Sequence, residues 1–249
     1  MITMAAWAPD GVTNKEVMLW SEGCARVRYD GTVRTIKSGQ PRGAGRLVNL
    51  WPGEPEVLAT AGFTVDFWSA RRDADGNYIR LAGRPTAGEG GGPLMRGFGW
   101  IQAVAEPGHQ GVLAANNGGL NYWPISALVT NASEGGGWGF DNGGVPNVAA
   151  LLETNRPSGP SRVFLARLDG FVNVFDLDGR ELGLLNAEGP IIGMALLGKA
   201  GGPRRLAVGT RFGVALFSPD LRRIGFHAAP AVAFAGPGGR KADRRENCT

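Results

Sequence analysis

Two short acidic segments carry the residue pattern that comes closest to a metal site. The segments 73–77 (DADGN) and 176–179 (DLDG) alternate carboxylates, as the start of an oxygen-ligand calcium loop does. Such a loop also needs a later carboxylate, and Glu181 lies near the second segment only. Asp-Gly is equally typical of tight turns, because glycine adopts a positive φ without steric cost. The turn interpretation is the stronger one, so we predict no metal ligand.

Histidine and cysteine are too scarce for the common catalytic and metal-binding sites. The chain has two histidines, His109 and His227, and two cysteines, Cys24 and Cys248. These counts exclude a three-histidine zinc site and a disulfide framework. They are compatible with a Ser-His-Asp triad, but neither a G-x-S-x-G motif nor a G-x-x-x-x-G-K-[ST] phosphate loop occurs. We therefore predict no catalytic residue and no cofactor.

Aromatic residues lie within or beside two glycine-rich stretches, 88–92 and 135–139. The second stretch contains Trp138 and is followed closely by Phe140. Aromatic side chains exposed on flexible loops are well suited to stacking on sugars or on the side chains of a partner. Trp138 and Phe140 are therefore candidate binding residues, and the alternative is that they cap a hydrophobic core.

Polar residues in short turns form a second set of binding candidates. Such turns connect apolar, β-prone runs at several places in the chain. If the turns share one face of the molecule, their side chains converge there, which is typical of a ligand site. The candidates in these turns are Asn116, Asn117, Arg167, Asp169 and Arg211.

The elements that position these turns are clearest in residues 162–188, RVFLARLDGFVNVFDLDGRELGLLNAE. Apolar and β-branched runs alternate here with Asp-Gly turns at 169–170 and 178–179. This arrangement is the strongest short-range signal for a β-hairpin. We therefore predict three short strands joined by two tight turns.

The same pattern recurs along the chain at intervals of roughly 40–55 residues. Aligned on the aromatic residue that ends the second hairpin strand, the copies share the anchors Tyr29, Trp68, Trp123, Phe175 and Phe217. An apolar strand precedes each copy, and a further strand follows most of them. Four antiparallel strands per unit at this period are typical of a β-propeller blade. We expect the last four anchors to be buried between blades.

The predicted fold is all-β, a β-propeller of about five four-stranded blades. The expected blades are 1–45, 46–99, 100–144, 145–189 and 190–229. The third blade is the weakest member, because its expected fourth strand around Leu128–Thr130 is poorly marked. The glycine-rich stretches 83–99 and 131–146 are expected to link one blade to the next.

A sixth inner strand is expected at Pro230–Ala235 (PAVAFA). The propeller would then span 1–236, followed by a polar tail at 237–249. This tail cannot supply the three further strands of a sixth blade. An incomplete ring is therefore favoured over a closed ring of five blades.

The stretch DGFVNVFDLDGREL, residues 169–182, resembles the repeats of the bacterial PQQ-type and WD40-like propeller superfamily. A PQQ-type repeat usually ends in a tryptophan that docks neighbouring blades, where this chain has Leu184 or Leu185. A WD40 repeat usually has a Gly-His pair and a closing Trp-Asp, for which Phe175-Asp176 is the nearest match. The resemblance implies a propeller and leaves the subfamily open.

Charge and hydropathy exclude several classes of partner. The formal charge is +4, and residues 240–249 contribute +2 of it through four basic and two acidic residues. No basic face is therefore implied for the folded part, and no nucleic-acid partner is predicted. No apolar run approaches the ~18 residues of a membrane span, and the first residues lack a signal-peptide pattern. No compartment is predicted.

The function that these features favour is a non-catalytic β-propeller that serves binding or scaffolding through loops on one face. A protein or a carbohydrate is the expected ligand. Two alternatives stay open: a propeller enzyme, either quinone-dependent or polysaccharide-active, and a structural domain of a longer polypeptide. If the ring is open, the chain is expected to form an oligomer or to belong to a larger polypeptide.

Overall fold

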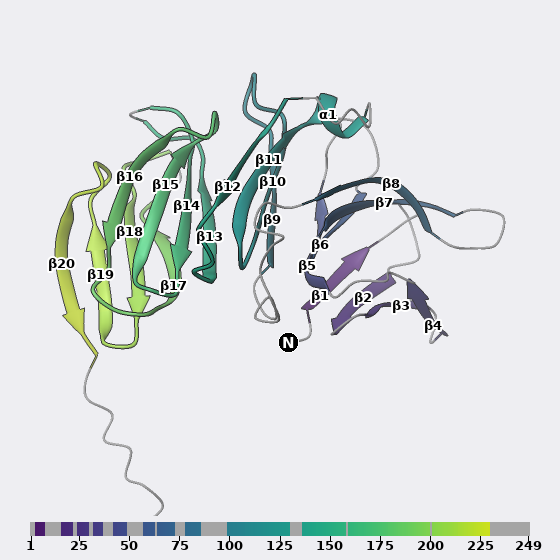
Figure 1. Cartoon of the computed structure of the whole chain (residues 1–249), viewed down its shortest axis with the longest axis horizontal. Helices are drawn as coiled ribbons and strands as arrows, with labels where there is room; N and C mark the ends of the chain where they lie inside the picture. The colour runs from purple at the N-terminus through teal and green to yellow at the C-terminus, as the bar shows by residue number, and fades with distance from the viewer. Residues whose placement is uncertain are drawn as a thin grey trace, which may run out of the picture.

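The structure is a computed structural model, and its described residues form five four-stranded antiparallel sheets (Figure 1). Before residue 99, it describes the backbone of the strands and the side chains of Val57 and Phe67. After that point it describes residues 99–129, 136–157, 159–199 and 201–229. The expected all-β class, with almost no helix, is confirmed for these residues.

The first two sheets precede residue 99. The first sheet consists of β1 (Thr3–Trp7), β2 (Glu16–Ser21), β3 (Cys24–Tyr29) and β4 (Thr32–Ile36). The second consists of β5 (Arg42–Val48), β6 (Val57–Gly62), β7 (Thr64–Arg72) and β8 (Tyr78–Pro85).

The other three sheets follow in chain order. The third consists of β9 (Gly99–Val104), β10 (Gly111–Asn116), β11 (Gly119–Pro124) and β12 (Trp138–Asp141), with α1 (Ile125–Val129) between its last two strands. The fourth consists of β13 (Asn147–Glu153), β14 (Arg162–Arg167), β15 (Phe171–Asp176) and β16 (Glu181–Asn186). The fifth consists of β17 (Ile191–Leu197), β18 (Arg205–Thr210), β19 (Gly213–Phe217) and β20 (Arg223–Ala228). Across the described part of the chain, no helix is long and apolar enough to cross a membrane.

The sheets stand side by side in chain order (Figure 1). The first strand of each sheet contacts the first strand of the next, in the series β1, β5, β9, β13 and β17. The sheet of β1–β4 lies at one end of the series and the sheet of β17–β20 at the other. Each sheet between them therefore has two flanks, one toward the preceding sheet and one toward the next.

Side chains that alternate along the strands fill the spaces between sheets, since successive residues of a strand point to opposite faces. Between the third and fourth sheets, Leu113 and Tyr122 pack with Leu165 and Phe175. Between the fourth and fifth sheets, the buried cluster is Phe164, Ala166, Val172, Val174, Leu185, Ala187, Ile191, Leu206, Val208, Ala215 and Phe217. Apolar side chains of the fourth sheet are thus buried on both of its flanks, against the third sheet and against the fifth.

The anchor residues are buried where the repeat is strongest. Phe175 and Phe217 are almost fully buried between sheets, as predicted. Trp123 is only half-buried, so the prediction of full burial is wrong for this residue. The side chain of Trp68 lies outside the described residues.

The anchor expected in the first repeat is wrong by one residue. Phe217 lies four residues after Gly213, which pairs across the turn between β18 and β19. The same count from Cys24, which pairs across the turn between β2 and β3, reaches Arg28 rather than Tyr29. A shift of one residue along a strand exchanges its two faces. The alignment of Tyr29 with Phe217 is therefore out of register by one residue.

The fourth strand of the third sheet lies later than expected. Residues Ile125–Val129 form α1, and the sheet is completed by β12 at Trp138–Asp141, which pairs with β11. The expected strand at Leu128–Thr130 and the reading of 131–146 as a linker throughout are therefore wrong. Alternating Trp138 and Phe140 mark a strand, but the surrounding glycines resemble a loop. The expected sixth strand at Pro230–Ala235 lies outside the described residues.

We predict that Phe175→Ala lowers the free energy of unfolding by ~3–5 kcal/mol, because it empties a site packed between two sheets. Urea denaturation followed by tryptophan fluorescence measures the change. Phe212→Ala removes the same side chain from an exposed position and serves as the matched control. Equal stability of the wild type and Phe175→Ala would contradict the packing described above.

Candidate binding face

Three hairpin turns and two connections between sheets come together on one face, which we call the hairpin face. The turns are 116–119, 167–170 and 210–213, and the connections are 142–146 and 187–190. Leu168 N donates a hydrogen bond to Pro146 O (2.8 Å). Arg211 N likewise donates to Pro190 O (3.2 Å). The turns therefore lie beside the connections, as the repeat predicts.

Asn116 shapes the first of these turns from inside. Its side chain is buried, and its Oδ1 accepts hydrogen bonds from the backbone N–H groups of Gly118 and Gly119, both at 2.9 Å. Asn117 is half-buried, and its carbonyl oxygen accepts a hydrogen bond from Asn142 Nδ2 (3.1 Å). Both predicted binding residues thus hold the turn in place, and a direct contact with a ligand stays a prediction.

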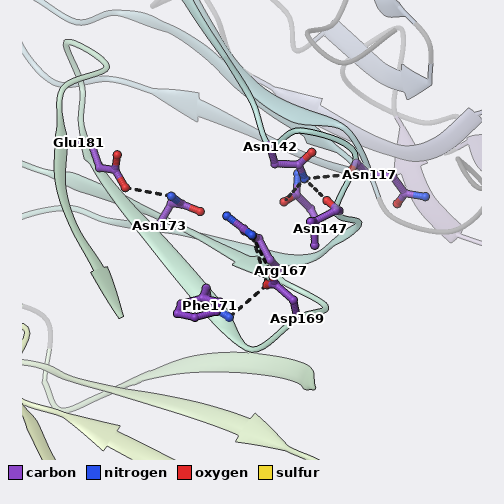
Figure 2. A network of polar contacts seen from close by, with 9 residues as sticks. Asn117, Asn142, Asn147, Arg167, Asp169, Phe171, Asn173 and Glu181 are labelled. Atoms are coloured by element: carbon purple, nitrogen blue, oxygen red, sulfur yellow. Dashed lines mark hydrogen bonds and ion pairs between the residues drawn. The ribbon is translucent and has the colours of Figure 1, made fainter. Parts of the chain in front are cut away.

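Two buried asparagines fasten this turn to the following sheet (Figure 2). Asn147 Nδ2 donates to Asn116 O at 2.8 Å, which ties β13 to the turn. Asn142 Nδ2 donates to Asn147 Oδ1 at 2.9 Å and also to Val145 O. Buried amides with such partners fix one arrangement of the chain, because an unpaired buried amide is costly.

In the second turn, Arg167 and Asp169 pair with each other (Figure 2). Arg167 Nη2 lies 2.5 Å from Asp169 Oδ2, and Asp169 Oδ1 accepts a weaker bond from Phe171 N at 3.4 Å. The Arg167 guanidinium also lies over the Phe171 ring, 5.8 Å from its centroid. Both charged groups are partly exposed, so the turn presents an oriented ion pair.

Apolar side chains project from the second and third turns. Phe212 is 60% exposed and Leu168 is 44% exposed, while Arg211 beside Phe212 is also exposed. A Cβ added to Gly170 would lie 2.8 Å from Gly189 O, and one added to Gly189 would lie 2.7 Å from the Phe212 ring. Gly189 therefore brings the two turns into close contact, and the positive φ of both glycines suits the bend.

The aromatic candidates Trp138 and Phe140 do not lie on an exposed loop, so that expectation is wrong. Both are half-buried on β12 and pack against Phe175, with ring centroids 5.9 Å and 4.8 Å away. Trp138 Nε1 donates a hydrogen bond to Leu177 O at 2.8 Å. The alternative that they cap a hydrophobic core is confirmed, and their role in binding is untested.

The acidic segment 176–179 is held as a turn. Asp176 Oδ1 accepts hydrogen bonds from the backbone N–H groups of Asp178 (3.1 Å) and Arg180 (2.8 Å). Asp178 Oδ1 lies 2.9 Å from His109 Nε2, which links the third and fourth sheets. Burial, and secondarily the charge of Asp178, raises the pKa of Tyr122. The segment 73–77 lies outside the described residues.

A buried carboxylate joins the fourth and fifth sheets at the strand ends away from the hairpin face. Glu153 Oε2 lies 2.6 Å from Arg162 Nε, and Glu153 Oε1 lies 3.4 Å from Arg204 Nε. Arg162 Nη1 donates to Pro219 O at 2.8 Å, which reaches the turn before β20. Burial lowers the pKa of Arg162, and its hydrogen bond to Glu153 opposes that shift. These contacts give the cluster a structural role.

The described residues include no cluster of side chains suited to binding a metal ion. No group of three or more histidine, cysteine, aspartate or glutamate side chains there is placed to hold a metal ion. The polar side chains that converge on the hairpin face include amides, the exposed Arg211 and the ion pairs Arg167–Asp169 and Glu188–Arg223. The arrangement is suited to recognition by shape, hydrogen bonds and apolar contact.

No family model and no curated protein matches the chain. Solved structures do resemble it. BBS1N in complex with ARL6DN, in crystals soaked with lead and with mercury, gives TM-scores of 0.61 and 0.58, at 13% identity over 91% of this chain and 68% of that chain. Sqt1 of Saccharomyces cerevisiae gives a TM-score of 0.59, at 13% identity over 86% of this chain and 60% of that chain.

BBS1N and Sqt1 are β-propeller proteins, and the likeness places the chain in the propeller class. The antiparallel four-stranded sheets agree with this class. The prediction of a propeller fold is thus confirmed at the level of the class. The chain matches about two thirds of the length of BBS1N and somewhat less of Sqt1.

Sequence reasoning missed Asn142, Asn147, Leu168 and Phe212. The asparagines follow a glycine-rich stretch, so they resembled ordinary loop residues. Leu168 and Phe212 lie in turns whose polar residues carry the sequence signal for a binding site. Both are large apolar residues in turns between strands, where small and polar residues are usual, and this contrast is the signal that identifies them.

We predict that Asn147→Ala lowers the free energy of unfolding by ~1–3 kcal/mol, because it removes the buried hydrogen bonds that Asn147 makes with Asn142 Nδ2 and with Asn116 O. Asn186→Ala is the control, since the Asn186 side chain makes one hydrogen bond at an exposed turn. Equilibrium urea unfolding of the three proteins measures the difference. Equal losses in both variants would show that the buried amides do not fasten the face.

Proposed function

We propose that this chain is a non-catalytic β-propeller module that binds a protein partner through the hairpin face. The observation that carries the proposal is the exposure of Phe212 (60%) and Leu168 (44%) beside the charged side chains of Arg167 and Arg211. Aromatic residues and arginines are enriched at the energetically important positions of protein interfaces. The predicted residues Asp169 and Arg211 fit the polar rim of such a surface.

The way the face is built supports this proposal. Asn116, Asn142 and Asn147 hold the first turn and its connection with buried hydrogen bonds. A surface that is already ordered loses little conformational entropy when a partner binds. The resemblance to BBS1N, which was crystallised in complex with ARL6DN, agrees with a propeller that contacts a protein.

A carbohydrate ligand has less support than a protein ligand. The expected stacking residues, Trp138 and Phe140, are half-buried and pack against Phe175. Stacking on a sugar requires an accessible ring face, and Phe212 is the most exposed ring among the described residues. One isolated ring suits an apolar pocket on a partner better than a row of sugar units.

We also propose that the five sheets form an arc of a larger ring, followed by the polar tail 237–249. The similar chains are longer than this one, which covers 68% of BBS1N and 60% of Sqt1. In the described residues, β1–β4 contacts β5 of the next sheet, and β17–β20 stands at the other end of the series. The alternative of a structural domain within a longer polypeptide agrees with the same arrangement.

We predict that Phe212→Ser abolishes capture of a specific partner and leaves folding intact. The tagged chain is cross-linked to its partners in cells of the organism from which it comes. The cross-linked peptides are then identified by mass spectrometry. Leu184→Ser, which replaces an apolar side chain of similar exposure on β16, is the matched control. Cross-links from residues 167–170 and 210–213 should disappear in Phe212→Ser only.

Two results would count against the proposal. Cross-links that persist equally in Phe212→Ser and Leu184→Ser would place the partner elsewhere on the molecule. Visible absorbance of a bound quinone after reconstitution with calcium would support the enzyme alternative instead.

A further inference from the structure

The flank of the fifth sheet that faces away from β13–β16 carries apolar side chains that no described residue covers. We call it the outer flank and define it by Ile192 and Ala195 on β17 and by Val214 and Leu216 on β19. Ile192 is 68% exposed and Val214 is 37% exposed. Around them the flank carries small residues: the atoms nearest to a Cβ added at Gly209 belong to Ile192 and to the Gly193 carbonyl, at 3.5 Å or more.

The same positions in the fourth sheet are covered by a neighbouring sheet. Val172 is the equivalent of Val214, because each is the second residue of its strand after the hairpin turn, in β15 and β19. Val172 is fully buried, in the cluster shared with β17–β20. Val148 is the equivalent of Ile192, because both lie at the bulge near the start of their strand, and Val148 packs on that cluster. The outer flank therefore has the same positions as the flank of the fourth sheet that packs on β17–β20, but no described sheet packs on it.

After the fourth and the fifth sheets, the chain bonds back to a hairpin turn and a proline follows, three residues after Ala187 but directly after Ala229. Ala187 N donates to Gly170 O at 2.9 Å, and the chain then passes Pro190 into β17. Ala229 N donates to Phe212 O at 2.9 Å, and the next residue is Pro230. A proline also precedes β13, so the sequence at 230–235 follows the pattern that starts an inner strand.

We propose that residues 230–235 form the next inner strand and pack on β17 over Ile192 and Ala195. Aligned on Pro190 and Pro230, Phe234 takes the position of Met194, and Ala231 takes the position of Ile191. The segment thus begins the cover that the outer flank requires. Val214 and Leu216, two strands away, stay uncovered. This inference goes beyond the proposed binding function and does not depend on it.

The test is a pair of cysteine cross-links in the full chain, with Cys24 and Cys248 replaced by serine. Ala195→Cys with Phe234→Cys should be joined by a short thiol cross-linker ~10-fold faster than Val214→Cys with Phe234→Cys, because a docked strand has a high local concentration at one site only. Val214 lies at the turn end of β19, near Ala228, so an undocked segment would reach it at least as readily. Equal rates would overturn the proposal, and so would cross-links between two chains.

A second measurement does not depend on the cross-linker. Ile192→Cys should react with a thiol reagent several-fold more slowly in the full chain than in a chain that ends at Ala229. Ile192 is exposed, so this substitution leaves the fold intact. Val214→Cys should react equally in both chains and serves as the control. Equal reactivity of Ile192→Cys in the two chains would overturn the proposal.

Discussion

Burial of apolar side chains between neighbouring sheets is the constraint on which the rest of this structure depends. A four-stranded sheet with apolar residues on both faces cannot be stable alone, because each face exposes a large area to water. The fourth sheet meets this requirement on both sides, with Phe175 on one flank and Phe164, Val172 and Val174 on the other. The order of the sheets in space then follows from the order of the repeats in the sequence.

This packing also determines where recognition is possible. The strands hold the hairpin turns together at one end, and buried amides complete the attachment through Asn142 and Asn147. The other ends of the strands are joined by the pair of Glu153 and Arg162 and by the contact of His109 with Asp178. With both ends fastened, the exposed side chains of the hairpin face sit on a rigid base, as binding loops on propellers and sandwiches commonly do.

Most of the fold could be predicted because period-two alternation and Asp-Gly turns are local signals. Residues 162–188 show this best, since three strands and two turns were placed almost to the residue. The errors arose where local signals conflict. The glycines around Trp138 indicate a loop where the structure has β12. The aromatic Tyr29 indicates an anchor one residue after the position that the strand pairing gives, Arg28. The turns of the candidate site were also found, but the buried role of Asn116 was not. Which polar residue faces inward depends on contacts between distant segments, and no local pattern encodes them.

The central claim is that the hairpin face is a rigid surface held by contacts between turns and connections. Amide hydrogen exchange of the full chain tests it most directly. The account predicts slow exchange, comparable with strand amides, for the N–H groups of Gly119, Leu168 and Ala187, which donate to buried or connecting groups. Gly143, whose N–H bonds to an exposed Asp141 carboxylate, should exchange fast. Fast exchange at all four positions would contradict the account, because the turns would then be ordinary mobile loops.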